Sequence, residues 1–194
     1  MKPLVLILSL VTLSACGGGS PAPELYKLTA HAPEMKRCKS GASIKIYEPM
    51  VAPGLDNPRI AVIDRPQHQT FYKGVRWNAS AGRVVQNFFV DTFERSGMFA
   101  TVTTDDSTTR TGWLMETQLR EFHVDQSAGA PQVVVRLTAS LVQAGSRNVV
   151  ATLPLESSMD VTGRDTAGII EAFNTQMVTL SEQMLSTFRS KLGC

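Results

Sequence analysis

Three cysteines and three histidines are the residues of this chain that are typical of zinc sites. A zinc site needs several such ligands at short, regular spacing. The histidines are instead scattered along the sequence, at His31, His68 and His123, and each is best explained as a structural or surface residue. The cysteines are equally far apart, at Cys16, Cys38 and Cys194. The spacing therefore predicts no metal site.

Groups for acid/base or nucleophilic catalysis are missing as well. The acidic pair Asp105-Asp106 lies in a threonine-rich stretch that is typical of a solvated loop. The patterns GxxxxGK[ST], GxSxG and HExxH do not occur in the sequence, which removes the usual signals for a nucleotide cradle, a nucleophile elbow and a zinc protease. The sequence thus predicts no catalytic residue, no cofactor and no enzymatic activity.

Cys16 stands directly after a run from Leu4 to Leu13 that is almost wholly apolar. The run suits the core of a signal peptide and is shorter than the roughly 20 apolar residues of a membrane-spanning helix. Leu13, Ser14, Ala15 and Cys16 form a pattern that resembles the bacterial lipobox. The resemblance implies cleavage before Cys16, diacylglycerol on its sulfur and acylation of its new amine. The alternative is a plain secretory signal with an incidental cysteine.

The predicted organisation is a signal peptide over residues 1–15, then a lipidated amino terminus and flexible linker over residues 16–24. Several acyl chains hold a protein stably on a bilayer, so this segment is expected to anchor the protein through lipid. In enterobacterial lipoproteins, Asp after the cysteine tends to retain the protein in the inner membrane. Gly17 therefore favours the periplasmic face of the bacterial outer membrane, with the inner membrane as the less favoured alternative.

The remainder, residues 25–194, has the length of a single periplasmic domain with a sizeable core. Lys and Arg number 19 and Asp and Glu 17, for a formal net charge of +2, and no block of like charges occurs. Nucleic acid is therefore not an expected partner. The sequence leaves the oligomeric state open, and a homo-oligomer is compatible with it.

With Cys16 assigned to lipid by the lipobox resemblance, Cys38 and Cys194 remain. The predicted periplasmic compartment is oxidising, which favours a structural disulfide between them. Such a bond would tie the start of the domain to the last residue of the chain. Free thiols are the main alternative, and a catalytic or redox pair is a weaker one.

Two helices are expected to form the domain's core. The first is capped by Asn78 or Ser80 and ends at Gly97, and its apolar face follows helical spacing. The second begins at Thr162 or Asp165, and its core-facing stripe is Ile170, Phe173, Met177, Leu180, Met184 and Phe188. The methionines in this stripe are typical of core filling.

Strands are predicted over residues 26–29, 43–47, 59–64, 113–125, 132–143 and 148–158, with extended structure again from residue 99 to 102. Residues 67–77 have a mixed polar and apolar pattern, which predicts short strands or loop. A bulge is expected between Leu119 and Phe122 because the apolar parity changes there, and Pro154 favours an edge or irregular strand. The predicted fold class is α+β: a two-layer domain with an antiparallel or mixed sheet and two helices packed on one face.

Several stretches together resemble the ABC-type transport auxiliary lipoproteins, a family that includes the lipoprotein of the paraquat-inducible Pqi system. The resemblance begins with the lipobox and Tyr26-Lys27-Leu28 and is strongest over residues 44–102. The family's patterns are matched here by Pro53, Leu55, Asp56, Arg59, Ile60, Arg76-Trp77, Phe93, Gly97, Phe99 and Val102. Two features depart from the family: Asn78-Ala79-Ser80 replaces an acidic or proline-rich segment, and the Cys38–Cys194 pair is not a general mark of it.

The resemblance implies an accessory role in an ABC-type lipid (phospholipid) transport system. Its partners would be a permease, an ATPase and a mammalian-cell-entry protein, with this chain as docking or acceptor component in outer-membrane lipid homeostasis. The residues alone indicate a tethered binding or docking module. The alternatives are a stand-alone binder of hydrophobic ligands and an envelope-structure lipoprotein. Trp77 is expected in the core and Arg59 in a local pair.

Overall fold

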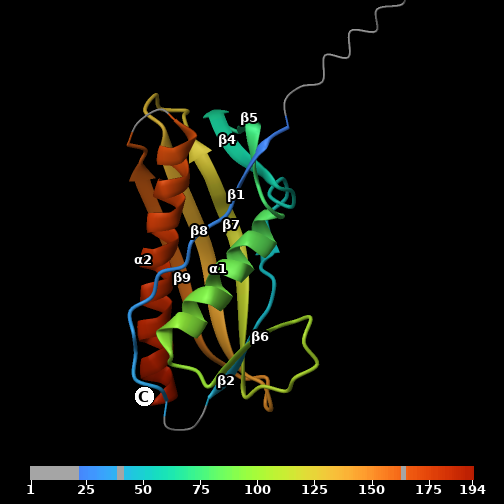
Figure 1. Ribbon diagram of the computed structural model, residues 1–194, viewed down its shortest axis with the longest axis vertical. Coiled ribbons are helices and arrows are strands. Elements are labelled where there is room, and N and C mark those ends of the chain that lie inside the picture. Colours follow the sequence, from blue (N-terminus) through green and yellow to red (C-terminus); the bar gives the residue numbers. More distant parts are fainter. Residues whose placement is uncertain (1–21, 39–41, 163–164) are drawn as a thin grey trace, which may run out of the picture.

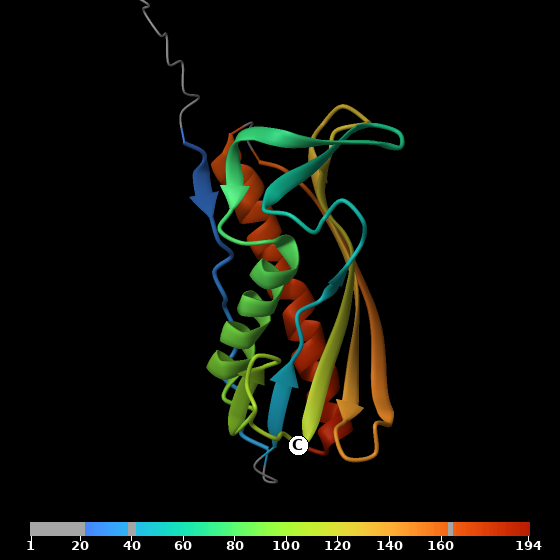
Figure 2. The same ribbon diagram turned by 90° about the vertical axis from the view of Figure 1, so that its right-hand side faces the viewer.

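A computed structural model describes residues 22–38, 42–162 and 165–194 of the chain. Cys16 and the predicted signal peptide lie outside the described residues. The described chain forms one nine-stranded mixed sheet with two long helices, α1 (Ala81–Ser96) and α2 (Thr166–Leu192), packed on one face of it (Figures 1 and 2). The predicted two-layer α+β fold is therefore confirmed.

The sheet is built around the long strand β7 (Trp113–Asp125). One edge of β7 pairs antiparallel along its whole length with β8 (Gln132–Gln143), which pairs in turn with β9 (Val149–Asp160). The register between β7 and β8 shifts between Leu119 and Glu121, which confirms the expected bulge. The shift places Leu119 and Phe122 on the same buried face, where both side chains are 1% exposed.

Three short strands meet the other edge of β7 one after another, and all run parallel to it. They are β2 (Ser43–Ile46), β3 (Met50–Val51) and β4 (Arg59–Arg65), which pair with the start, middle and end of β7 respectively. Outside β2 lies a further parallel strand, β6 (Thr101–Thr104). Because β2, β3 and β4 pair one after another with the same strand, the chain segments that connect them leave the sheet and return to it.

β5 (His68–Trp77) corrects the expectation of short strands or loop over residues 67–77. It pairs antiparallel with β4 as a hairpin that extends beyond the body of the sheet (Figure 2). Most of its side chains are therefore exposed or half-buried, and the sequence lacks the clean alternation of a strand over a core. β1 (Glu24–Tyr26) pairs parallel with β5, so the first strand begins and ends earlier than the predicted 26–29.

Both helices begin after residues predicted as their caps, and α1 ends at the predicted Gly97. Ser80 and Asp165 are the amino-terminal caps, and their side chains accept hydrogen bonds from the backbone N–H groups of Arg83 and Gly168. Gly97 ends α1 with a φ of 65°, the left-handed conformation that glycine adopts without steric cost.

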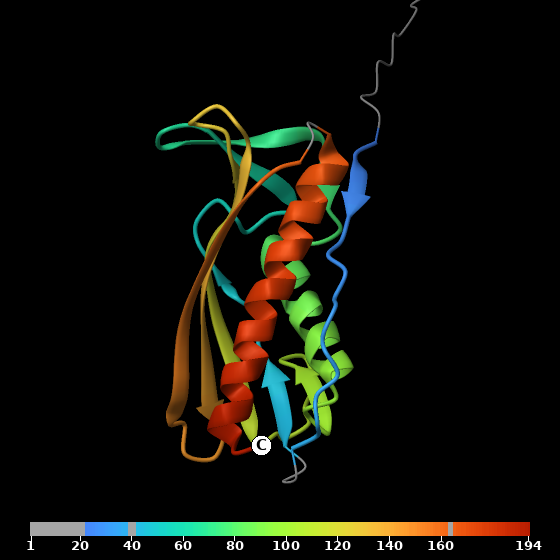
Figure 3. The same cartoon turned by 90° about the vertical axis from the view of Figure 1, so that its left-hand side faces the viewer.

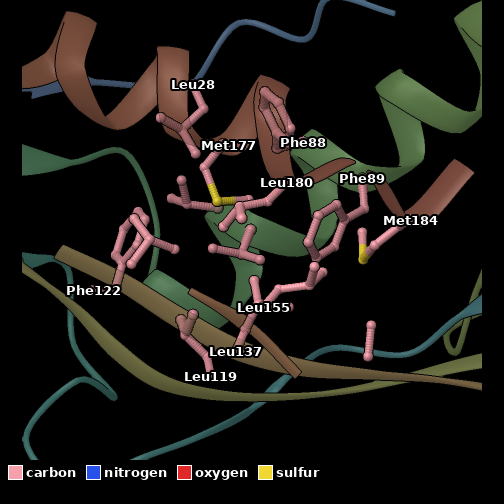
Figure 4. Packing of buried hydrophobic residues seen from close by; sticks show 14 of the residues in the cluster. Leu28, Phe88, Phe89, Leu119, Phe122, Leu137, Leu155, Met177, Leu180 and Met184 are labelled. Carbon is pink, nitrogen blue, oxygen red and sulfur yellow. The ribbon is translucent and has the colours of Figure 1, made fainter. Parts of the chain in front are cut away.

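The space between the helices and the sheet is filled by apolar side chains (Figure 4). The buried apolar residues of α2 are Ile169, Ala172, Phe173, Met177, Leu180, Met184, Leu185 and Phe188. The predicted stripe contained Ile170, but that residue is only partly buried and its neighbour Ile169 is 3% exposed. The sequence pattern cannot distinguish two adjacent isoleucines, and the packing of α2 on the sheet places Ile169 in the core. Trp77 is 1% exposed and packs on Phe122 and Phe173, as expected of a core residue.

Candidate functional site

The stretch of residues 27–38, here called the strap, connects β1 to the far end of the molecule. It runs in extended form over the outer side of the helices, on the face opposite the sheet (Figures 2 and 3). Leu28, Ala30 and Cys38 are buried, with exposed fractions of 7%, 6% and 2%. The strap is therefore packed against the domain through these three buried side chains and the partly buried Ala32 and Met35, while its other residues are exposed.

Hydrogen bonds attach β1 and the strap to the elements on either side. They join the Asn78 N–H to the Tyr26 carbonyl (2.8 Å), the Thr29 N–H to Asn174 Oδ1 (2.7 Å), the Met35 N–H to the Ser96 carbonyl (2.8 Å) and the Cys38 N–H to the Met98 carbonyl (3.0 Å). The contacts involve α2 and both ends of α1. The strap thus bridges the two helices.

A disulfide between Cys38 and Cys194 closes the far end of the strap. The two Cα atoms are 5.1 Å apart, within the usual range for such a bond, and 156 residues separate the cysteines along the chain. Cys194 follows the left-handed Gly193 that ends α2, and its carbonyl accepts a hydrogen bond from Arg189 Nε at 3.0 Å. The disulfide therefore connects the strap to the end of α2.

The near end of the strap is fixed by β1. The Tyr26 hydroxyl donates to Glu24 Oε2 at 2.8 Å, and this bond to a carboxylate raises the pKa of Tyr26. Leu25 between them points outward and is 65% exposed. The predicted lipid-bearing Cys16 lies outside the described residues, on the amino-terminal side of this strand.

A network of side chains that the sequence analysis did not identify joins α1 to the chain around it. Arg83 pairs with Glu48 (2.7 Å) and with Asp106 (3.1 Å), and its Nη1 donates to Gln86 Oε1 (2.7 Å). Gln86 Nε2 donates to Asp105 Oδ1 at 2.6 Å. The acidic pair at residues 105 and 106 is therefore held against α1. A glutamine within the apolar face of α1 was the signal that could have revealed the network.

The three histidines take no part in a common site. His68 Nδ1 lies 2.5 Å from Asp64 Oδ1 near the turn of the β4–β5 hairpin, and this bond lowers the pKa of Asp64. His123 is half-buried on β7, and desolvation lowers its pKa. His31 is exposed on the strap. Among the described residues, no group of three His, Cys, Asp or Glu side chains is arranged to hold a metal ion.

Arg59 makes local contacts, as expected of an arginine that opens a strand. Its guanidinium carbon lies 3.8 Å from the centroid of the Phe71 ring on the neighbouring strand. Its backbone N–H also donates to Asn57 Oδ1 at 3.0 Å. Arg59 thus stabilises the base of the β4–β5 hairpin.

No helix in the described part of the chain has the length and apolar character that crossing a bilayer requires.

The fold is shared with solved bacterial proteins. Protein XCC0632 from Xanthomonas campestris, of the DUF330 family, superposes with a TM-score of 0.78 at 22% identity, over 86% of this chain and 95% of that one. The hypothetical protein CT253 from Chlamydia trachomatis gives 0.51 at 5% identity, over 78% and 97%. PelC from Paraburkholderia phytofirmans, solved as a dodecamer, gives 0.50 at 14% identity, over 81% and 93%. At these identities the likeness establishes the fold.

The family is established by sequence. The model of the ABC-type transport auxiliary lipoprotein component matches residues 26–185, which is most of the chain. The protein therefore belongs to the ABC-type transport auxiliary lipoprotein family, as the resemblance of its motifs predicted. No curated protein matches the chain.

Proposed function

We propose that this protein is the membrane-anchored periplasmic lipoprotein of an ABC-type lipid transport system and acts as its docking or acceptor component. Its partners are a permease, an ATPase and a mammalian-cell-entry protein, and its location is the periplasmic face of the outer membrane. The observation that carries the proposal is the family match over residues 26–185 behind a Leu-Ser-Ala-Cys sequence. The family supplies the transport system, and the cysteine pattern supplies the anchor.

The strap and β1 support a role that depends on tethering. A force or restraint applied at the amino terminus reaches β1 and then the strap, which is bonded to both helices and joined by the disulfide to the end of α2. A partner that binds anywhere on this domain is therefore kept within reach of the membrane. A docking component needs this property, and it needs no catalytic group.

The packing of the interior favours docking over a stand-alone binder of hydrophobic ligands. Such a binder needs an apolar cavity large enough for its ligand. Between the helices and the sheet, the described chain instead places close-packed side chains of α1, α2, β7, β8 and β9 (Figure 4). A lipid that reached this protein would therefore contact its surface.

The test is a crosslinked capture from native membranes, with the intact protein compared with Cys16→Ala. We expect the intact protein to recover the permease, the ATPase and the mammalian-cell-entry protein. The variant is expected to lose them because the lipid anchor positions the contact. Cys16→Ala would also keep its signal peptide, because the predicted cleavage site is lost. The control is therefore the same domain without the cysteine, exported by a cleavable secretory signal.

Density-gradient fractionation of the same membranes tests the location, and the intact protein should sediment with outer-membrane markers. If the intact protein recovers none of the three partners under mild crosslinking, the transport proposal is wrong. Binding to isolated sacculi would then favour the envelope-structure alternative.

A further inference from the structure

Three cations surround one groove on the surface of the domain. The groove has a volume of about 400 Å³ and is lined by Lys45, Arg110 and Arg147 together with Tyr47, Thr108 and Thr109. The cations come from three separate parts of the chain: strand β2, the loop between β6 and β7, and the turn between β8 and β9. In a chain whose net charge is only +2, this is a strong local excess of positive charge.

The groove lies at the end of the molecule opposite the one where the described chain begins. β1 is at one end, and the β6–β7 loop and the β8–β9 turn are at the other (Figures 1 and 2). Since the predicted anchor precedes β1, the groove faces away from the anchored end. Membrane lipids around the anchor therefore do not occupy it by proximity alone.

The folding of the β6–β7 loop separates its charges. Asp105 and Asp106 bond to Gln86 and Arg83 of α1, as described above. The residues that follow, Thr108 to Thr111, line the groove. The Thr111 hydroxyl donates to the Trp113 carbonyl at 2.9 Å. The carboxylates of the loop are thus held against the helix, and Arg110 remains for the groove together with Thr108 and Thr109.

The cations of the groove have no carboxylate partner within the described ranges. The ion pairs of the described chain involve other cations, namely His68, Arg83 and Arg136. No acidic residue lines this groove. Lys45 Nζ donates to the Ser107 carbonyl at 2.7 Å, which holds the amine at the base of the loop and leaves its charge uncompensated. Arg110 and Arg147 are exposed. Cations that line one groove without a carboxylate partner repel one another, and an anion between them relieves that repulsion.

We propose that this groove is an anion-binding site for a phosphate group. Guanidinium groups bind phosphate oxygens through paired N–H donors, an ammonium adds a point charge, and threonine hydroxyls add neutral donors. The groove is larger than a bare phosphate, so it also has room for the groups esterified to one. The shared chemistry is the phosphate itself, whether free in the periplasm or part of a lipid headgroup. Binding of a lipid headgroup at this site rests on the proposed transport function, whereas binding of free phosphate does not.

The test uses the full-length lipidated protein in uncharged detergent and measures binding by isothermal titration calorimetry. One titration uses inorganic phosphate, and the other uses glycerophosphoglycerol, a phosphodiester headgroup without acyl chains. Binding of both would assign the site to phosphodiesters such as headgroups, and binding of phosphate alone would assign it to the free ion. Either result supports the site.

Arg110→Gln/Arg147→Gln is expected to weaken binding about tenfold or more because two charge-assisted contacts are lost. Arg110→Lys/Arg147→Lys should restore most of the affinity. The matched control is Arg65→Gln/Lys73→Gln, which removes the same charge from exposed positions on the β4–β5 hairpin and should leave binding unchanged.

The site is refuted if the wild type binds neither ligand. It is also refuted if the glutamine variant binds as well as the wild type, or if the hairpin control loses affinity equally. None of these results bears on the capture of transport partners, so failure of the site and failure of the proposed function can be told apart.

Discussion

Gln86 is the polar residue on which the contact between α1 and β2 depends. Its side chain is 0% exposed, and its Nε2 donates to the Ile46 carbonyl at 2.9 Å as well as to Asp105. Its Oε1 accepts from Arg83, so every polar atom of the amide has a partner. A buried amide that is fully bonded fixes the position of each chain it contacts.

Gln86→Leu should therefore destabilise the domain. Leucine fills a similar volume but leaves the buried Ile46 carbonyl without this donor, at a cost of about 1–3 kcal/mol in the free energy of unfolding. Urea denaturation measures the change. Gln183→Leu, the same substitution at an exposed position of α2, is the control and should stay within about 0.5 kcal/mol. Equal effects of the two substitutions would show that Gln86 has no special role.

His123 gives the stability a dependence on pH. Desolvation lowers its folded pKa below the usual 6.5, and this effect outweighs the opposing influence of Glu121 and Asp125. Between the lowered pKa and 6.5 the unfolded chain binds more protons than the folded one, so stability falls as the pH falls through that window. His123→Gln should flatten this slope.

Urea midpoints measured at several pH values across the window test this expectation, with the exposed His31→Gln as control. An unchanged slope in His123→Gln would show that other groups cause the dependence.

At the scale of elements, α1 could be read from the sequence because its signals are local. Ser80 and Gly97 mark its ends, and the apolar spacing between them is a property of the helix itself. The parallel pairing of β2, β3 and β4 with β7 could not be predicted from the sequence, because it joins residues up to about 70 positions apart. The strap lacks regular periodicity for the same reason: its contacts are made with α1 and α2.

The disulfide is the strongest single restraint on the strap. Cys38→Ser/Cys194→Ser should lower the free energy of unfolding by about 2–5 kcal/mol, since a bond across 156 residues removes much freedom from the unfolded chain. Hydrogen exchange should also accelerate at the Met35 and Cys38 amides, which donate to Ser96 and Met98.

The reduced wild type should behave like this double variant, and reduction should leave the variant unchanged. If exchange at the two amides stayed slow without the disulfide, hydrogen bonds and packing alone would hold the strap.

Pro154 protects the free edge of β9, which pairs with β8 alone in the described sheet. The Val161 N–H donates to the directly opposite Pro131 carbonyl, and hydrogen-bonded pairs alternate along such a ladder. The pair Thr138–Pro154 is therefore a non-hydrogen-bonded one, and the proline nitrogen faces the free edge. Edge strands with unpaired N–H groups invite pairing with other chains, and a proline removes one donor.

Pro154→Thr should thus increase self-association by restoring an outward N–H in the middle of the edge. Sedimentation velocity over a range of protein concentrations measures it. Thr152→Val, on the same strand and the same side of the ladder, changes a side chain without adding a donor and should associate no more than the wild type. Equal behaviour of all three proteins would show that Pro154 does not protect this edge.

The whole molecule is elongated, with its predicted anchor at one end. α2 has 27 residues and is about 40 Å long, and it runs from near β1 to the far end of the domain (Figure 1). Six residue steps from Cys16 to Ala22 span at most about 21 Å. With lipid on Cys16, as predicted, we expect the end that carries β1 to stay close to the membrane and the opposite end, with its cationic groove, to extend farther away on average.

Fluorophores placed at Gln67, on the tip of the β4–β5 hairpin, and at Ser146, in the β8–β9 turn, can measure this orientation. With the lipidated protein in vesicles that contain nitroxide-labelled headgroups, the label at Gln67 should be quenched more strongly. A tether at one end restricts the near end to the membrane's vicinity but lets the far end sample more distant positions. A secreted form without Cys16 should show no quenching of either label, which controls for direct adsorption. Equal quenching of the two labels in the lipidated protein would mean that the domain lies flat, and the end with the groove would then lie as near the bilayer as the β1 end does.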